Sequence, residues 1–148
     1  MNKNVYAPVK GKVINITEVN DPVFSEKMIG DGIAIMPCDE YICSPIDGTI
    51  ESIFPTNHAF IVKSEENHQI LVHIGLDTVE LNGKPFKRLI KNQSKVHAGD
   101  AIIKSNYKMI QDKGFDPIVI VVLSDEKISS KTNLKSIDSL DDVLFTIE

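Results

Sequence analysis

His58 and His73 are the two side chains of this sequence whose type and spacing point to group-transfer or metal chemistry. They flank a segment that reads as a β-hairpin, with one strand over Ala59–Lys63, a polar turn, and a second strand over Gln69–Ile74. The question that the sequence raises first is therefore whether this hairpin brings the two imidazoles together.

The register of the hairpin decides that question. A turn centred between positions 65 and 66 pairs His58 directly with His73, and a four-residue loop over 65–68 leaves them diagonal to each other. Side chains alternate between the two faces of a strand, so either register puts both imidazoles on one face, together with Phe60 and Leu71. A register shifted by one residue would place the histidines on opposite faces.

Two imidazoles on an apolar face have three interpretations. They are packed core residues, or they are two ligands of a zinc site, although zinc takes three or four ligands and no third His, Cys or acid stands at ligand spacing. In the third interpretation one is a nucleophile, because a neutral imidazole nitrogen reacts well near neutral pH, and the other stabilises charge on a transferred group. The remaining histidines, His68 and His97, stand in polar turns and are interpreted as solvated surface residues.

The elements that must position this pair read as short β-strands separated by Gly, Pro, Asn or Asp. Many short strands with frequent turn signals indicate a sandwich or barrel. Helical signals are weak and fall on Pro22–Ile29 and Asn106–Lys113, while Ser136–Leu144 reads as either helix or loop. Besides the hairpin, the predicted strands are Val5–Pro8, Lys12–Ile16, Gly32–Met36, Thr49–Phe54, Ala101–Lys104, Ile118–Leu123 and Val143–Ile147.

One sequence pattern, small–Pro–aliphatic–x–Gly–x–aliphatic, occurs at 7–13 and again at 44–50. Proline cannot donate to a central ladder, and glycine permits the backbone conformation of a tight turn. Two copies indicate a sheet with approximate internal symmetry. The alternative is that Pro-x-x-Gly turns recur by chance in β-proteins.

Composition restricts the function further. The 148 residues carry a net charge of −5, which argues against nucleic acid as a ligand and allows a basic protein partner. The length fits one domain over 1–148. The longest aliphatic run, Ile118–Leu123, is far shorter than the ~20 residues of a spanning helix, and the N-terminus lacks the apolar core of a signal peptide. We therefore expect no membrane insertion and a cytoplasmic location.

Cys38 and Cys43 are too few for a disulfide framework and read as incidental thiols on a hairpin.

The segments Thr56-Asn57-His58-Ala59-Phe60 and Leu71-Val72-His73-Ile74-Gly75-Leu76-Asp77-Thr78-Val79 carry a family resemblance. They are similar to the supporting-histidine and phosphorylation segments of the glucose-family IIA domain of the bacterial sugar phosphotransferase system, and the separation of their histidines fits. The resemblance extends in order from about Val5 to Ser124. Its further matches are Ala7-Pro8, 23–27, 30–35, 45–50, 80–83, Phe86-Lys87 and Gly99-Asp100.

The resemblance implies a phosphocarrier. His73 would accept a phosphoryl group on Nε2 from the phosphohistidine of the carrier HPr and pass it to a cysteine of a IIB domain of a sugar permease. His58 would donate a hydrogen bond to the phosphoryl oxygens, and Thr56 would orient His58. Such transfer depends mostly on positioning and charge stabilisation. No cofactor is required, although the family also implies a zinc ion shared between His58, His73 and an acid of a partner.

The resemblance also implies a docking rim and a fold. Asp21 and Asp77 would contact basic residues of HPr, and an apolar rim would keep water from the phosphoryl group. The fold implied is all-β, an antiparallel sandwich or distorted barrel of the duplicated hybrid motif type with short helical turns, and we expect a monomer. The sugar is not specified, because specificity lies in the membrane IIC domain. The residues assigned to the apolar rim are Val23, Ile29, Phe54, Phe60 and Leu71.

Three other functions compete with this interpretation. Val96–Ile102 is similar to the turn of a biotinyl or lipoyl carrier domain, but the Met-Lys-Met of such domains is absent and the chain is nearly twice their length. A zinc peptidase of the lysostaphin type needs a His-x-His pair, and Leu71 stands where the first histidine is required. A regulatory protein of the same fold without the transfer is the third alternative, and it leaves both histidines without a role.

Overall fold

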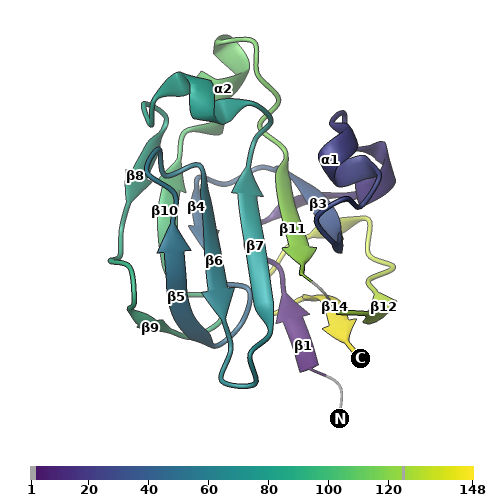
Figure 1. Cartoon of the computed structure of the whole chain (residues 1–148). Helices are drawn as coiled ribbons and strands as arrows, with labels where there is room; N and C mark the ends of the chain where they lie inside the picture. Colours follow the sequence, from purple (N-terminus) through teal and green to yellow (C-terminus); the bar gives the residue numbers. More distant parts are fainter. Residues whose placement is uncertain (1–2, 125) are drawn as a thin grey trace.

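The computed structural model describes residues 3–124 and 126–148, and most of its elements are β-strands (Figure 1). Every strand pairing is antiparallel, which confirms the predicted all-β class with only short helical turns. The strands are β1 (Lys3–Tyr6), β2 (Gly11–Asn15), β3 (Asp31–Pro37), β4 (Tyr41–Cys43), β5 (Gly48–Ile53), β6 (Ala59–Lys63), β7 (Gln69–Ile74), β8 (Phe86–Arg88), β9 (Lys95–Val96), β10 (Ala101–Ser105), β11 (Val119–Leu123), β12 (Ile128–Lys131), β13 (Ser136–Ile137) and β14 (Val143–Ile147). The helical elements are α1 (Pro22–Ser25), α2 (Tyr107–Asp112) and the 3₁₀ turns η1 (Ile16–Glu18) and η2 (Thr78–Leu81).

An eight-stranded sheet in the order β13-β2-β3-β11-β7-β6-β5-β9 forms the body of the molecule, and Figure 1 shows β5, β6, β7 and β11 side by side within it. Strand β11 is buried on both faces, because Val119 and Val121 join the main core while Ile120 and Val122 join a second apolar cluster on the other face. A continuous aliphatic run is the sequence pattern of a strand covered on both sides.

Two three-stranded sheets, β1-β14-β12 and β4-β10-β8, complete the fold. The two small sheets correspond strand by strand, with β1, β14 and β12 matching β4, β10 and β8. The two halves of the large sheet correspond as well: counted inward from its two edges, β13, β2, β3 and β11 match β9, β5, β6 and β7. The approximate internal symmetry indicated by the repeated Pro-x-x-Gly pattern is therefore present in the topology.

The residue just before each copy of that pattern donates to the proline carbonyl of the other copy. Tyr6 N–H donates to the Pro45 carbonyl at 2.8 Å, and Cys43 N–H donates to the Pro8 carbonyl at 2.7 Å. The glycine of each copy, Gly11 or Gly48, begins a strand against a neighbouring carbonyl. A Cβ would lie 2.0 Å from the Met36 oxygen at Gly11 and 2.3 Å from the Lys63 oxygen at Gly48, so both positions need glycine.

Each predicted strand is present, displaced by at most two residues at an end. The strands that the sequence did not reveal, β4, β8, β9, β12 and β13, have two to four residues, too few for a visible alternation. Ser136–Leu144 is not a helix: it holds β13, a loop and the start of β14. The hairpin expected at Cys38 and Cys43 is also wrong, because β3 and β4 belong to different sheets; Cys38 is exposed and Cys43 is buried, and both thiols are free.

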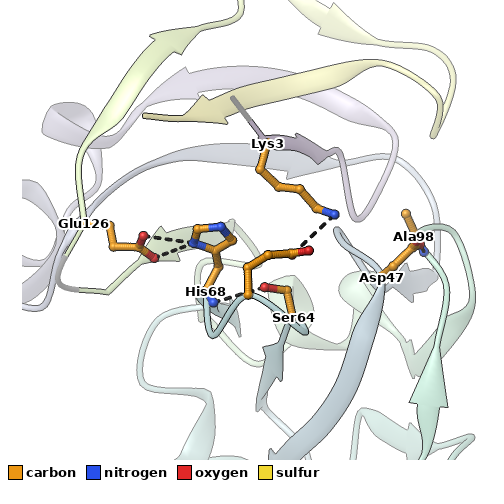
Figure 2. Close-up of polar contacts among 7 residues, drawn as sticks. Lys3, Asp47, Ser64, His68, Ala98 and Glu126 are labelled. Atoms are coloured by element: carbon orange, nitrogen blue, oxygen red, sulfur yellow. Dashed lines mark hydrogen bonds and ion pairs between the residues drawn. The ribbon is translucent and has the colours of Figure 1, made fainter. Parts of the chain in front are cut away.

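The β6–β7 hairpin follows the predicted strand bounds, and side-chain contacts hold its turn in place. Ser64 Oγ accepts a hydrogen bond from His68 N–H at 3.0 Å, and His68 Nδ1 lies 2.9 Å from the Glu126 carboxylate. Lys3 from β1 reaches Glu66 at 3.6 Å, and Figure 2 shows these groups around the turn. His68 is therefore half-buried and paired, which corrects the interpretation of it as a solvated residue.

The pairing of β6 with β7 sorts their side chains onto two faces. Phe60 lies opposite Val72, and both are fully buried in the main core. Ala59 lies opposite His73 and Ile61 opposite Leu71, so these side chains occupy the other face. The expectation that Phe60 shares a face with Leu71 and the histidines is wrong, because the register is shifted by one residue from the two that would put both histidines on one face.

Replacing Phe60 by alanine tests this sorting. We expect Phe60→Ala to lower the free energy of unfolding by about 3–5 kcal/mol, because it empties a fully buried ring site. The matched control, Ile61→Ala on the opposite face, should cost about 1 kcal/mol. Urea unfolding followed by circular dichroism measures both values, and equal losses would contradict the assigned faces.

Candidate active site: the histidine pair

A hollow of about 230 Å³ opens at the C-terminal end of β7 and holds both histidines. Asp21 and α1, the turn before β6, the end of β7 and the start of η2 supply its walls. The residues that line it are Asp21, Val23, Phe24, His58, His73, Asp77, Thr78 and Val79.

The two imidazoles meet although the regular ladder would separate them. Ala59 pairs with His73, so position 58 falls opposite Ile74, which is the register expected to place the histidines on opposite faces. His58, however, stands before the first residue of β6 and directly after Asn57, whose φ is +59°. Alternation holds only within a regular strand. The ring centroids of His58 and His73 consequently lie 5.2 Å apart, at 81°.

The protonation of His73 is set by a backbone acceptor. His73 Nδ1 lies 2.8 Å from the Gly75 carbonyl oxygen, which can only accept, so Nδ1 carries the proton and donates. In the neutral ring this leaves the lone pair on Nε2. Gly75 has a φ of +79°, and a Cβ there would lie 2.4 Å from Thr78 Cγ2, so the acceptor position requires glycine.

His58 is held by its own turn. Its Nδ1 bonds to the hydroxyl of Thr56, as the resemblance implies, and Phe54 meets the imidazole edge-on at 5.4 Å between centroids. His58 is only 7% exposed. A hydroxyl can donate to Nδ1, and that arrangement places the ring proton on Nε2.

A short helix supplies a further aromatic wall that the sequence analysis did not assign to the site. Asp21 caps α1 by accepting from Val23 N–H at 3.0 Å, and Pro22 occupies the first helical position. The helix sets Phe24 against His73 at 5.0 Å between ring centroids. The Asp-Pro pair signals this helix start in the sequence, but only the fold shows which ring the helix faces.

Burial controls the pKa of both histidines. Desolvation and, to a smaller extent, the neighbouring His58 lower the pKa of His73 to about 4, against opposing effects of the Gly75 carbonyl, Asp21 and Asp77. Desolvation also lowers the pKa of His58. Both rings are therefore neutral at pH 7, the form in which imidazole nitrogen is a nucleophile.

The structure brings part of the expected docking rim to the hollow. Asp21, Val23 and Asp77 line it, with Val23 39% exposed. Phe54 lies beside His58, and Leu71 is half-buried two residues before His73 on the same strand.

Two residues of the expected rim lie elsewhere. Phe60 is 0% exposed in the main core, so its assignment to the rim is wrong. Ile29 is exposed, but it lines a separate hollow beside Lys27 and Lys127. Phe24, Thr78 and Val79 also line the hollow and were not predicted as site residues, although they stand within segments that carry the family resemblance.

The histidine pair offers two nitrogen ligands to a metal. Within residues 3–124 and 126–148 there is no group of three or more His, Cys, Asp or Glu side chains arranged to hold a metal ion. A zinc site here needs a further ligand from another molecule.

Comparison with known proteins decides the family. The sequence model for the phosphoenolpyruvate-dependent sugar phosphotransferase system, EIIA 1, matches residues 3–128. The chain belongs to this family. It is therefore a phosphotransferase component of the sugar phosphotransferase system, as the resemblance implied.

Individual relatives agree with this assignment. A glucose-specific EIIA component of Buchnera aphidicola is 46% identical over 81% of this chain and 74% of the relative. A glucose-specific EIICBA component of Streptococcus pneumoniae is 40% identical over 95% of this chain, which spans only 19% of that relative.

The fold agrees as well. The glucose permease IIA from Mycoplasma capricolum superposes with a TM-score of 0.90 at 31% identity, covering 99% of this chain and 96% of that one. Among the described residues there is no helix that is long and apolar enough to cross a membrane.

The pKa of His73 gives a pH prediction. We expect the imidazole of His73 to titrate with a midpoint of about 4, because burial disfavours the cation. The unfolded chain binds this proton at the ordinary value of about 6.5, so the folded state loses stability as pH falls from about 6.5 to about 4. NMR titration of the imidazole resonances measures the midpoint, with His73→Ala for assignment. A midpoint near 6.5 would contradict the burial argument.

Proposed function

We propose that His73 accepts a phosphoryl group on Nε2 from the phosphohistidine of HPr and passes it to a cysteine of a IIB domain. The observation that carries the proposal is the bond from His73 Nδ1–H to the Gly75 carbonyl, which leaves the Nε2 lone pair as the only nucleophile of the ring. The reaction takes place in the cytoplasm between monomeric partners, and the sugar is specified elsewhere in the permease.

Each step exchanges one bond to phosphorus for another. In the first step the Nε2 lone pair of His73 forms a P–N bond while the P–N bond of the donor breaks, and its electron pair returns to the donor imidazole. In the second step a thiolate of IIB forms a P–S bond, and the electron pair of the breaking bond returns to His73 Nε2. Both steps need close approach and in-line geometry more than covalent help from the protein.

His58 and Thr56 stabilise the transferred group in this proposal. A hydroxyl proton donated by Thr56 to His58 Nδ1 fixes the ring proton on Nε2, where it can donate to a phosphoryl oxygen. Its ring is 5.2 Å from that of His73 and its pKa is lowered by burial, so it acts as a neutral donor. A donor held in place before reaction costs no reorganisation during it.

The walls of the hollow suit a labile P–N bond and a basic donor. Phe24 covers one side of His73, and Phe54 covers one side of His58. Asp21 and Asp77 add negative charge at the mouth, in a chain whose net charge is −5. A basic surface on HPr would be steered to this face, and the aromatic walls would limit water.

Phosphorylation can be tested directly. We expect incubation with phosphoenolpyruvate, enzyme I and HPr to add the mass of one phosphoryl group, stable at mildly alkaline pH and lost in acid. His73→Ala should abolish the gain, because the nucleophile is removed. Intact-mass spectrometry measures both proteins. Labelling of His73→Ala at full stoichiometry would contradict the site assignment. No gain in mass by the parent protein with active HPr would contradict the proposed function.

Replacing His58 separates the two steps. We expect His58→Gln still to accept a phosphoryl group from HPr but to pass it on to IIB about 100- to 1000-fold more slowly, the usual cost of losing one preorganised donor. Rapid-quench measurement of each step gives the two rates, with His97→Gln, at an exposed turn residue, as the control. Normal onward transfer would remove His58 from the mechanism.

Zinc is proposed as an inhibitor at this pair rather than a cofactor. Both Nδ1 atoms are engaged, so zinc and phosphorus would compete for Nε2 of His73. We expect chelation with EDTA to leave phosphoryl acceptance by His73 unchanged. We expect ZnCl₂ to slow acceptance only in the presence of a partner whose carboxylate supplies the missing zinc ligand. Loss of acceptance in EDTA would contradict this arrangement.

A further inference from the structure

The two histidines are positioned by unequal means. His73 lies within β7, which pairs with β6 on one side and β11 on the other. His58 lies outside any strand: its carbonyl accepts from Ile74 N–H at 2.7 Å, and it ends a turn in which Asn57 N–H donates to the Phe54 carbonyl, also at 2.7 Å. The phosphoryl-stabilising imidazole therefore depends on the geometry of a short turn between β5 and β6.

Asn57 is the residue on which this turn depends. Its φ of +59° is left-handed, a conformation that residues other than Gly, Asn and Asp rarely adopt. The same residue directs the chain out of the regular pleat, so that His58 reaches His73. A group that fixes Asn57 consequently fixes the approach of His58.

Arg88 is such a group. Its Nε–H donates to Asn57 Oδ1 at 2.9 Å, across 31 residues of sequence. Arg88 ends β8, which belongs to the separate sheet β4-β10-β8 and is anchored in the main core by Phe86. The hydrogen bond thus connects the turn that carries His58 to an independently held strand.

Two further observations favour a positioning role. The chain just before β8 also approaches the turn, because a Cβ at Gly83 would lie 3.3 Å from the Thr56 carbonyl oxygen. Within residues 3–124 and 126–148, Arg88 forms no ion pair with a carboxylate, so its guanidinium is not already committed to one. The segment from 83 to 88 therefore supports the turn at Thr56 and at Asn57.

We propose that Arg88 is a positioning residue for His58: its bond to Asn57 holds the left-handed turn that presents the His58 imidazole to the phosphoryl group on His73. This inference rests on the proposed phosphocarrier function. In the part of the chain that the structure describes, Arg88 forms a hydrogen bond with Asn57 and none with either imidazole, so its effect passes through Asn57.

Rates of the two transfer steps form the first test. We expect Arg88→Ala and Asn57→Gly each to slow transfer from the phosphorylated protein to IIB about tenfold, less than the about hundredfold cost of a full 1 Å misplacement. Acceptance from HPr should change less than about twofold. Glycine at 57 keeps the left-handed turn accessible while removing the amide, so it tests the hydrogen bond rather than the backbone. Lys87→Ala, the exposed neighbour in β8, is the matched control and should leave both rates unchanged.

The double variant tests whether the two residues act as one unit. Combining Arg88→Ala with Asn57→Gly should slow onward transfer no more than either change alone, because both remove the same bond. Multiplied effects would overturn the proposal, as would an equal loss in Lys87→Ala. Where Arg88→Ala proves unstable, Arg88→Lys keeps the charge and stem but lacks the Nε donor, and it should show the same loss.

A second readout is independent of phosphoryl transfer. We expect the ring nitrogen shifts of His58 in NMR spectra to change in Arg88→Ala, while those of His73 stay as in the parent protein. Unchanged His58 shifts together with unchanged rates would refute the positioning role. If the parent protein itself accepts no phosphoryl group, the proposed function fails, and the His58 shifts still decide whether Arg88 positions that ring.

Discussion

The hydrogen bond from His73 Nδ1–H to the Gly75 carbonyl is the constraint on which the site depends. It decides which ring nitrogen keeps its lone pair. It exists only because β7 ends in a glycine turn, in which Gly75 N–H also donates to the Ile118 carbonyl at 2.7 Å. Burial then keeps the ring neutral by lowering the pKa of His73 to about 4. Backbone geometry and desolvation thus prepare one nitrogen without any charged partner in direct contact.

The second histidine shows a different way of holding a side chain. His58 reaches its partner only because the chain leaves the pleat at Asn57, and a bond from a separate sheet braces that turn. A strand with neighbours on both sides is held by a ladder of backbone bonds. This turn is held by a few backbone bonds, among them Asn57 N–H to the Phe54 carbonyl, and by the side-chain bond from Arg88. The two halves of the site accordingly differ in how many interactions fix them.

The strands that carry the site follow the internal symmetry of the fold, but the histidine pair occurs in one half of it. Strand orders correspond across β11 and β7, and the repeated Pro-x-x-Gly segments bond to one another through Tyr6 and Cys43. Both histidines nevertheless lie in the half built from β5, β6 and β7. The matching strand β11 contributes buried aliphatic residues that cover the sheet on both faces. The two halves of the sheet therefore share a strand order, and they differ in the side chains that give β7 its reactive histidine and β11 its buried aliphatic residues.

The sequence by itself determined the β class, the bounds of the main strands, the two histidines and the family, because alternation, glycine, proline and motif spacing are local properties. Only the tertiary structure decided which face Phe60 occupies, which register β6 and β7 adopt, and that Phe24 and Arg88 belong to the surroundings of the site. A register depends on how a turn is closed, and here Ser64 and His68 close it locally while Glu126 and Lys3 contact it from distant positions. Contacts between residues far apart in the chain leave no periodic trace in the sequence, so the fold alone brings them together.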